Sequence, residues 1–152
     1  MTSFSVSVLI NTPPDIVNRA MQNPENHTFW MTDLERFEIV KGGPEEVGSV
    51  ARLFYLQKGQ SYIMEDKLIA CEPGKKYVSE VSGDTIVARV EINLYPSGDS
   101  TEISLRWSGK AKNLMLKLML PLLRKKLIRQ TKDELAVFKG LVESKGVNFN
   151  IE

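Results

Sequence analysis

The chain has 152 residues, of which 42% are hydrophobic, and its formal net charge is +1. This size and apolar content predict a single domain, residues 1–152, with one hydrophobic core. The near-neutral charge argues against a nucleic-acid-binding protein, a class that usually carries a marked excess of basic residues.

Cys71 is the only cysteine and His27 the only histidine. A single cysteine excludes an intramolecular disulfide and fits a reducing compartment, and one Cys with one His does not make an ordinary zinc site. The first residues lack the charged lead and apolar core of a secretion signal. The longest apolar run is interrupted by Lys117 and Pro121 and is too short to span a bilayer. We therefore expect a cytoplasmic protein without a metal or redox cofactor.

Seven extended segments are predicted, because apolar residues alternate with polar ones between turns rich in Gly, Pro and Asp. They cover residues 4–10, 34–40, 47–56, 61–71, 77–81, 86–95 and 101–107. Short turns such as Glu72-Pro73-Gly74-Lys75 join most of them, so the strands should run mostly antiparallel.

Two short helices are predicted after the first strand. A proline pair suits a first helical turn and Thr12 can cap it, so one helix should run through about Met21. The second should begin near residues 23–25 and end near Trp30.

The last predicted element is one helix over residues 112–144, roughly 50 Å long at 1.5 Å per residue. Residues 114–123 are apolar nearly all round, with Lys117 as the only charge, and Pro121 should kink the helix. A helix that is apolar on every side must be covered on every side, or else it contacts a ligand, a membrane or a partner.

Charge is distributed unevenly along the chain. Residues 1–109 carry ten Lys and Arg against fifteen Asp and Glu, a net of −5, whereas residues 110–152 carry ten against four, a net of +6. We favour the interpretation that the basic helix pairs with an acidic sheet of the same molecule. The alternative is that it meets an anionic surface.

Several short segments follow one another in a recognisable order over almost the whole chain. They are the run Val8-Leu9-Ile10-Asn11-Thr12-Pro13-Pro14-Asp15-Ile16-Val17, the segment Asn23-Pro24-Glu25 leading to Trp30, Gly48, the run Cys71-Glu72-Pro73-Gly74-Lys75-Lys76, and Gly109 before a terminal helix with Glu143 near its end. In this order they resemble the START-like superfamily, also called SRPBCC or helix-grip, and in particular its polyketide-cyclase/dehydrase-like branch.

The resemblance implies an α+β fold in which a seven-stranded, curved antiparallel sheet grips a long C-terminal helix, with two short helices after strand 1. It also implies an internal cavity for a hydrophobic small molecule or lipid, and some members of the family are enzymes. No catalytic motif is shared by the whole family, so no acid, base or nucleophile is carried over. Our hypothesis is ligand binding between sheet and helix, and the alternative is a polyketide cyclase/dehydratase-like enzyme.

Large apolar side chains on the strand faces toward the helix, and on the helix itself, are the candidates for a cavity wall. The candidates are Trp30, Phe54, Tyr62, Met64 and Trp107 before the helix, and Met115, Leu118, Met119 and Leu122 on it. For each residue the simpler alternative is an ordinary position in the core.

Three side chains are weak candidates for proton transfer in the enzyme alternative. Asp66 shares the strand phase of Leu68 and Ala70, so its carboxylate could face the interior, where burial raises its pKa. A bulge or an outward register would instead leave Asp66 in solvent. His27 changes charge near neutral pH and lies near the expected cavity mouth, and Tyr62 shares the phase of Asp66.

The cations Arg124, Lys125, Lys126 and Arg129 could bind anionic lipid head groups beside the apolar run. The protein would then be a peripheral membrane or partner-docking module. The simpler alternative is a solvated helix face. The sequence leaves open the ligand and the oligomeric state.

Overall fold

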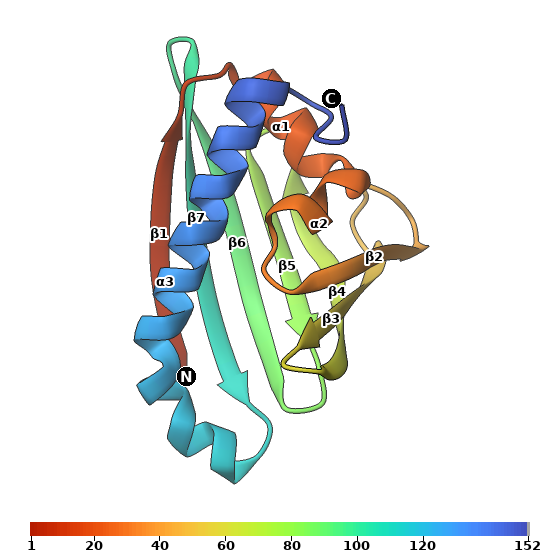
Figure 1. Cartoon of the computed structure of the whole chain (residues 1–152), viewed down its shortest axis with the longest axis vertical. Coiled ribbons are helices and arrows are strands. Elements are labelled where there is room, and N and C mark those ends of the chain that lie inside the picture. The colour runs from red at the N-terminus through yellow and green to blue at the C-terminus, as the bar shows by residue number, and fades with distance from the viewer. Residues whose placement is uncertain (152) are drawn as a thin grey trace.

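One sheet of seven antiparallel strands is the framework of the computed structural model, which describes residues 1–151 (Figure 1). The strand order is β1-β7-β6-β5-β4-β3-β2, so the first strand is paired with the last. The strands are β1 (Thr2–Ile10), β2 (Leu34–Lys41), β3 (Val50–Gln57), β4 (Gln60–Glu72), β5 (Lys76–Ser82), β6 (Ile86–Ser97) and β7 (Ser100–Ala111).

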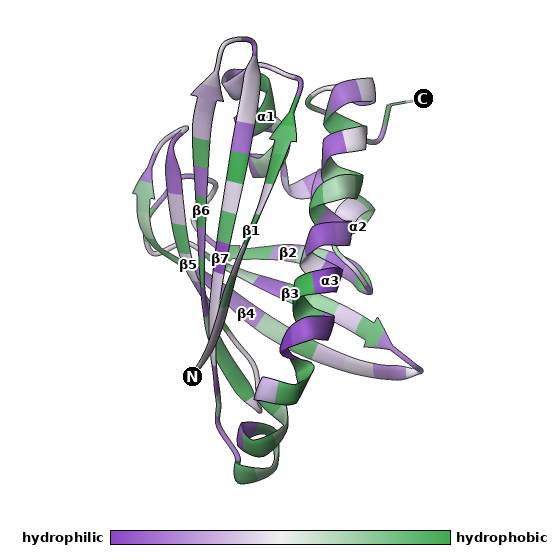
Figure 2. Cartoon of the chain, turned by 90° about the vertical axis from the view of Figure 1, so that its left-hand side faces the viewer, coloured by the Kyte–Doolittle hydropathy of each residue, from purple (hydrophilic) through white to green (hydrophobic). Residues whose placement is uncertain are grey.

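The predicted α+β fold is confirmed. The sheet bends so that β2 and β3 lie across from the long helix α3 (Leu114–Lys145), which runs along the other side of the molecule (Figures 1 and 2). All seven predicted strands are present, because the period-two alternation places one face of each strand against the helices. In β1, for example, Phe4, Val6 and Ile10 are buried and the serines between them are exposed.

The predicted short helices are α1 (Pro14–Gln22) and α2 (His27–Trp30), which follow one another through the 3₁₀ turn η1 (Pro24–Asn26). The proposed capping role of Thr12 is wrong, since the N-cap of α1 is Pro13 and no side chain caps it. Thr12 is buried instead, and its carbonyl oxygen accepts a hydrogen bond from the Thr101 hydroxyl at 2.9 Å.

The helix α3 begins with a side-chain cap and packs mainly against β1. The Asn113 side chain accepts a hydrogen bond from the N–H of Leu116 at 2.8 Å. Farther along, Leu135, Phe138 and Val142 are buried in the main core cluster. Pro121 lies inside the helix, and Figure 1 shows the axis changing direction in the first turns, the segment that contains this proline.

The segment after α3 is tied back to the start of the fold by Asn26, which is fully buried. Its amide nitrogen donates to the carbonyl oxygens of Ala20 at 2.9 Å and Val147 at 2.7 Å. Its amide oxygen accepts the N–H of Phe149 at 3.0 Å. This side chain therefore joins α1, η1 and the residues that follow α3, and it fixes the segment after the helix against α1.

The basic part of α3 does not pair with the acidic sheet, contrary to the interpretation we favoured from the sequence. Within residues 1–151 the ion pairs are Arg19–Asp15, Arg36–Glu38, Lys76–Glu91 and Lys139–Glu143. None of them involves the cations of residues 110–132. All eight are exposed; six lie on α3, Lys110 at the end of β7 and Lys112 in the connection between them.

Candidate functional site

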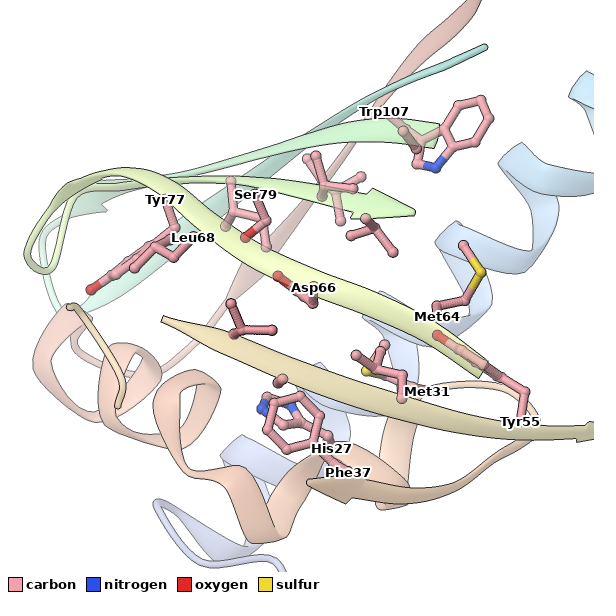
Figure 3. Close-up of a pocket in the computed structure, with 18 of the residues that line it drawn as sticks. His27, Met31, Phe37, Tyr55, Met64, Asp66, Leu68, Tyr77, Ser79 and Trp107 are labelled. Atoms are coloured by element: carbon pink, nitrogen blue, oxygen red, sulfur yellow. The ribbon is translucent and has the colours of Figure 1, made fainter. Parts of the chain in front are cut away.

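A cavity of about 650 Å³ lies between the sheet and the helices α2 and α3. Its wall takes residues from β1 to β7, from the end of α1 and α2, and from the middle turns of α3. Figure 3 shows side chains of β3, β4, β5 and β7 around this space, with Asp66 near its centre. The cavity exists because the sheet bends away from α3 while the helix stays packed against β1.

Most of the wall is apolar. Aromatic, branched and thioether side chains of the sheet, of α1, of the α2–β2 connection and of α3 contribute to it. They include Met21, Met31, Phe37, Leu53, Met64, Leu68, Val90, Ile92, Leu105, Trp107 and Leu127. Methionines at three places give the wall side chains that can adjust to the shape of a guest.

Trp107 forms part of the wall because the next position on the same face of β7 is Gly109, which has no side chain. Its indole is stacked on Phe4, with 5.4 Å between ring centroids, and it also covers Gly109. A Cβ atom at position 109 would lie 2.1 Å from the Trp107 ring. Gly109 is therefore required by this indole position, and any larger residue would displace part of the cavity wall.

Four of the nine predicted ligand-binding residues line the cavity: Trp30, Tyr62, Met64 and Trp107. The two tryptophans belong to opposite sides of it, Trp30 to α2 and Trp107 to β7. Trp30 also packs edge-on against Phe138 of α3, with 5.2 Å between centroids. These contacts place both indoles at the boundary between core and cavity.

Phe54 does not line the cavity. Its neighbours Leu53 and Tyr55 do, and the Phe54 ring lies on the other face of β3 under the guanidinium of Arg36, 4.0 Å from its carbon. The signal that could have shown this is Arg52, which shares the strand phase of Phe54 and is exposed.

The four predicted helix residues, Met115, Leu118, Met119 and Leu122, also lie outside the cavity and are exposed. The first turns of α3 meet the sheet through Leu120, on the opposite side of the helix. The helix contributes to the cavity one stretch later, with residues that the sequence analysis missed: Leu127, Gln130, Thr131 and Glu134. They share one helix face at i, i+3, i+4 and i+7, but only Leu127 is apolar, so the pattern of apolar residues gave no signal for the other three.

Asp66 lines the cavity, so it has the inward of the two orientations that the sequence left open. The bulge in β4 falls between Leu68 and Ala70, after Asp66, so it turns Ala70 outward and leaves the Asp66 phase unchanged. Burial raises the pKa of Asp66 to about 6, against a smaller opposing effect of the Ser79 hydroxyl. A carboxyl group in this state can take up or release a proton near neutral pH.

His27 lines the cavity close to Phe37, with 4.3 Å between their ring centroids. Burial lowers the pKa of His27 to about 4, so its ring is neutral at pH 7. Among the described residues its buried Nδ1 atom has no hydrogen-bond partner, and neither has the Nε1 atom of Trp30. His27 therefore adds a polar but uncharged group to the wall.

Two tyrosines and a glutamate form a second polar group in the wall. Tyr55 and Tyr62 are stacked across the β3–β4 pair, with 4.9 Å between ring centroids. The Glu134 carboxylate accepts the N–H of Thr32 at 2.7 Å, and burial raises its pKa above the usual range. Burial also raises the pKa values of both tyrosines, so they stay protonated and can donate hydrogen bonds.

Tyr77 closes another part of the wall, near the end of α1. Its hydroxyl oxygen accepts the N–H of Gly74 at 2.8 Å. It lies 2.6 Å from Oδ1 of Asn18 and 2.7 Å from Oε2 of Glu45, so it donates to one of the two at a time. This network holds the β4–β5 turn and the β2–β3 connection against α1.

Neither a reactive thiol nor a metal site of ordinary form is found among the described residues. Cys71 is a free, partly exposed thiol whose pKa is raised by burial and by Glu45 and Glu72, which disfavours its reactive thiolate. Within residues 1–151 no three His, Cys, Asp or Glu side chains are grouped to hold a metal ion. The chemistry that the cavity itself supports is burial of apolar groups, hydrogen bonding, and proton transfer at Asp66.

A model of the family described as polyketide cyclase/dehydrase and lipid transport matches residues 1–143. Among proteins with curated descriptions, none matches this sequence significantly.

Solved structures share the fold at low sequence identity. Protein CV1439 from Chromobacterium violaceum has a TM-score of 0.74 and 17% identity, over 93% of this chain and 96% of that one. The Zhui aromatase/cyclase from Streptomyces sp. R1128 has a TM-score of 0.73 and 14% identity, over 95% and 94%. A START superfamily protein from Mycobacterium smegmatis has a TM-score of 0.65 and 16% identity, over 86% and 94%. These likenesses show the fold.

Proposed function

Because the chain belongs to the polyketide cyclase/dehydrase and lipid transport family, we propose that it binds a hydrophobic small molecule or lipid in the cavity between the sheet and α3. The observation that carries the proposal is the cavity of about 650 Å³ with its largely apolar wall. Pockets that bind small molecules typically measure roughly 300–1,000 Å³, so the space suits one guest.

Burial of apolar surface would supply most of the affinity, at about 25 cal/mol per Å² removed from water. The polar groups of the wall would orient the guest. Ionised Asp66 and Glu134 can only accept hydrogen bonds, whereas Tyr55 and Tyr62 can donate them. The wall therefore suits an amphiphile with a large apolar body and one end that both donates and accepts hydrogen bonds, such as a hydroxyl group.

Extraction and identification of the small molecules that copurify with the protein test this proposal. We expect an apolar or amphiphilic compound in a fixed ratio to the protein. Its absence, together with no stabilisation of the protein by any member of a lipid and polyketide library, would count against the proposal.

A second candidate function is that of a polyketide cyclase/dehydratase-like enzyme, and the raised pKa of Asp66 inside the cavity favours it. Asp66 would transfer the proton, while neutral His27 and protonated Tyr62 would polarise or position the substrate. The substitution Asp66→Asn should then abolish turnover and leave binding intact. Turnover by Asp66→Asn at the original rate would eliminate this carboxyl group as the acid or base.

A cytoplasmic location is part of the proposal. It is supported by the single cysteine, Cys71, which is a free thiol and is suited to a reducing compartment.

A further inference from the structure

We propose that the first turns of α3 form a membrane-docking element that inserts into the surface of a bilayer containing anionic lipids. This inference goes beyond ligand binding and does not depend on it. It starts from an apolar tip, which we define as Leu114, Met115, Leu118, Met119 and Leu122. Their exposed fractions are 72%, 74%, 70%, 45% and 82%. Exposed apolar side chains gathered in this way usually mark a contact surface.

The apolar tip lies on the side of α3 that faces away from the sheet. The inner side of the same turns carries Leu120, which is buried, and Leu116 and Leu123, which are partly buried. These inner leucines already attach the helix to the protein. The outer leucines and methionines therefore have no role in holding the fold, and Figure 1 shows these turns at one end of the molecule.

A group of exposed cations, Lys125, Lys126 and Arg129, continues the same helix face directly after the apolar tip. Leu114, Leu118, Leu122, Lys125 and Arg129 follow one another at spacings of four, four, three and four residues, which places them in one row. Leu122 and Lys125 are only about 5 Å apart along the axis. An apolar end followed at once by a basic band matches the depth order of a membrane surface, with acyl chains below phosphate groups.

The charges in this region are uncompensated. Residues 110–132 contain eight Lys and Arg and no Asp or Glu. In the described part of the chain, no ion pair or side-chain hydrogen bond uses Lys125, Lys126 or Arg129. Arg124 differs, because its Nε donates to the carbonyl oxygen of Ser3 at 3.0 Å and so belongs to the fold. The free cations make an anionic surface the complementary partner.

Charge complementarity also favours a membrane over a second copy of the chain. A two-fold symmetric contact through this face would bring the same lysines and arginine of both copies together. No helix within residues 1–151 is long and apolar enough to cross a membrane. The surface suits shallow insertion with electrostatic attraction.

Docking in this orientation would bring one end of the cavity to the membrane. The N–H of Lys112 donates to the carbonyl oxygen of Thr85 at 2.7 Å, and the Lys112 ammonium donates to the carbonyl oxygen of Gly83 at 2.7 Å. Thr85 and Ile86 line the cavity. The β5–β6 turn therefore fastens this end of the cavity beside the start of α3.

Co-sedimentation with vesicles tests the proposal, with phosphatidylcholine alone compared with phosphatidylcholine mixed with phosphatidylserine. We expect the wild-type protein to bind the anionic vesicles and to release them as salt is raised. The double variant Leu118→Ser/Leu122→Ser should bind at least about tenfold more weakly, because its apolar contacts are lost. The double variant Lys125→Gln/Lys126→Gln should also bind at least about tenfold more weakly, because each cation near an anionic surface contributes about fivefold to the affinity.

Matched controls separate docking from a general change in surface character. Leu9→Ser/Val137→Ser removes two exposed apolar residues elsewhere, and Lys67→Gln/Arg89→Gln removes two exposed cations of the sheet. Both controls should bind like the wild type. The proposal is overturned if the wild type ignores anionic lipid, if the tip variants bind as well as the controls, or if the tip variants abolish only a dimer of the protein.

Discussion

At the scale of single residues, Asp66 and His27 are two cavity groups that titrate in the same pH range with opposite effects on stability. Burial raises the pKa of Asp66 from 3.8 to about 6, so the folded protein keeps a proton in this range that the unfolded chain has released. Burial lowers the pKa of His27 from 6.5 to about 4, so the unfolded chain takes up a proton that the folded protein excludes. As pH rises, Asp66 therefore lowers the free energy of unfolding and His27 raises it.

Asp66→Asn removes the first of these effects. We predict that the free energy of unfolding of this variant, relative to wild type, rises as pH increases through the Asp66 window and gains about 2 kcal/mol by neutral pH, allowing for partial access of water. Urea unfolding at a series of pH values measures it. For His27→Gln the direction is opposite: the free energy of unfolding of this variant, relative to wild type, should be greatest at acidic pH and fall as pH rises. Parallel curves for wild type and both variants would show that neither group is buried as described.

At the scale of elements, the buried Asn26 decides how the C-terminal end of α3 is held. It makes three hydrogen bonds to the backbone of Ala20, Val147 and Phe149. Replacing it by alanine leaves two carbonyl groups and one N–H without these partners.

Asn26→Ala should therefore lower the free energy of unfolding by about 3 kcal/mol, because several buried polar groups lose their partners at once. Asn148→Ala is the matched control, since Asn148 makes only a local hydrogen bond to the exposed N–H of Asn150. It should cost well under 1 kcal/mol, as surface substitutions usually do. Equal losses in the two variants, measured by chemical denaturation, would refute this assignment.

The elements themselves could be predicted from the sequence because their signals are local. Alternation of apolar and polar residues located all seven strands, and the long run after Gly109 located α3. What local patterns do not give is the face of an element that its neighbours cover. Phe54 and Leu53 are both apolar, and apart from the exposed Arg52 in phase with Phe54, the sequence does not tell which of the two points inward.

The same limit explains the errors on α3. Residues 114–123 are apolar nearly all round, so their composition does not distinguish the side that meets the sheet from the side left exposed. The sheet covers only the Leu120 side, and the apolar tip is left outside. Glu134, in contrast, was missed because a carboxylate next to Asp133 in a basic helix looks like a surface residue until Thr32 of the α2–β2 connection is brought against it.

At the scale of the whole molecule, α3 is held firmly along one edge of the sheet, while a cavity remains between the helix and the other strands. The helix α3 is packed along β1 and tied at its C-terminal end by Asn26, while β2 and β3 lie across from it (Figure 1). The cavity occupies the space between these two arms of the structure. Ligand binding, proton transfer at Asp66 and docking of the apolar tip would all use this one arrangement.

Mass spectrometry under conditions that keep noncovalent complexes intact tests the central claim, that the cavity holds a hydrophobic guest. Three proteins are compared: the wild type, Ala88→Phe, which fills the cavity wall at a buried position, and Ala70→Phe, which adds the same ring on the exposed face of the sheet. The account predicts an added mass on the wild type and on Ala70→Phe that denaturation releases, and a bare Ala88→Phe protein. Bare wild-type protein after incubation with the lipid library, or an unchanged guest on Ala88→Phe, would contradict it.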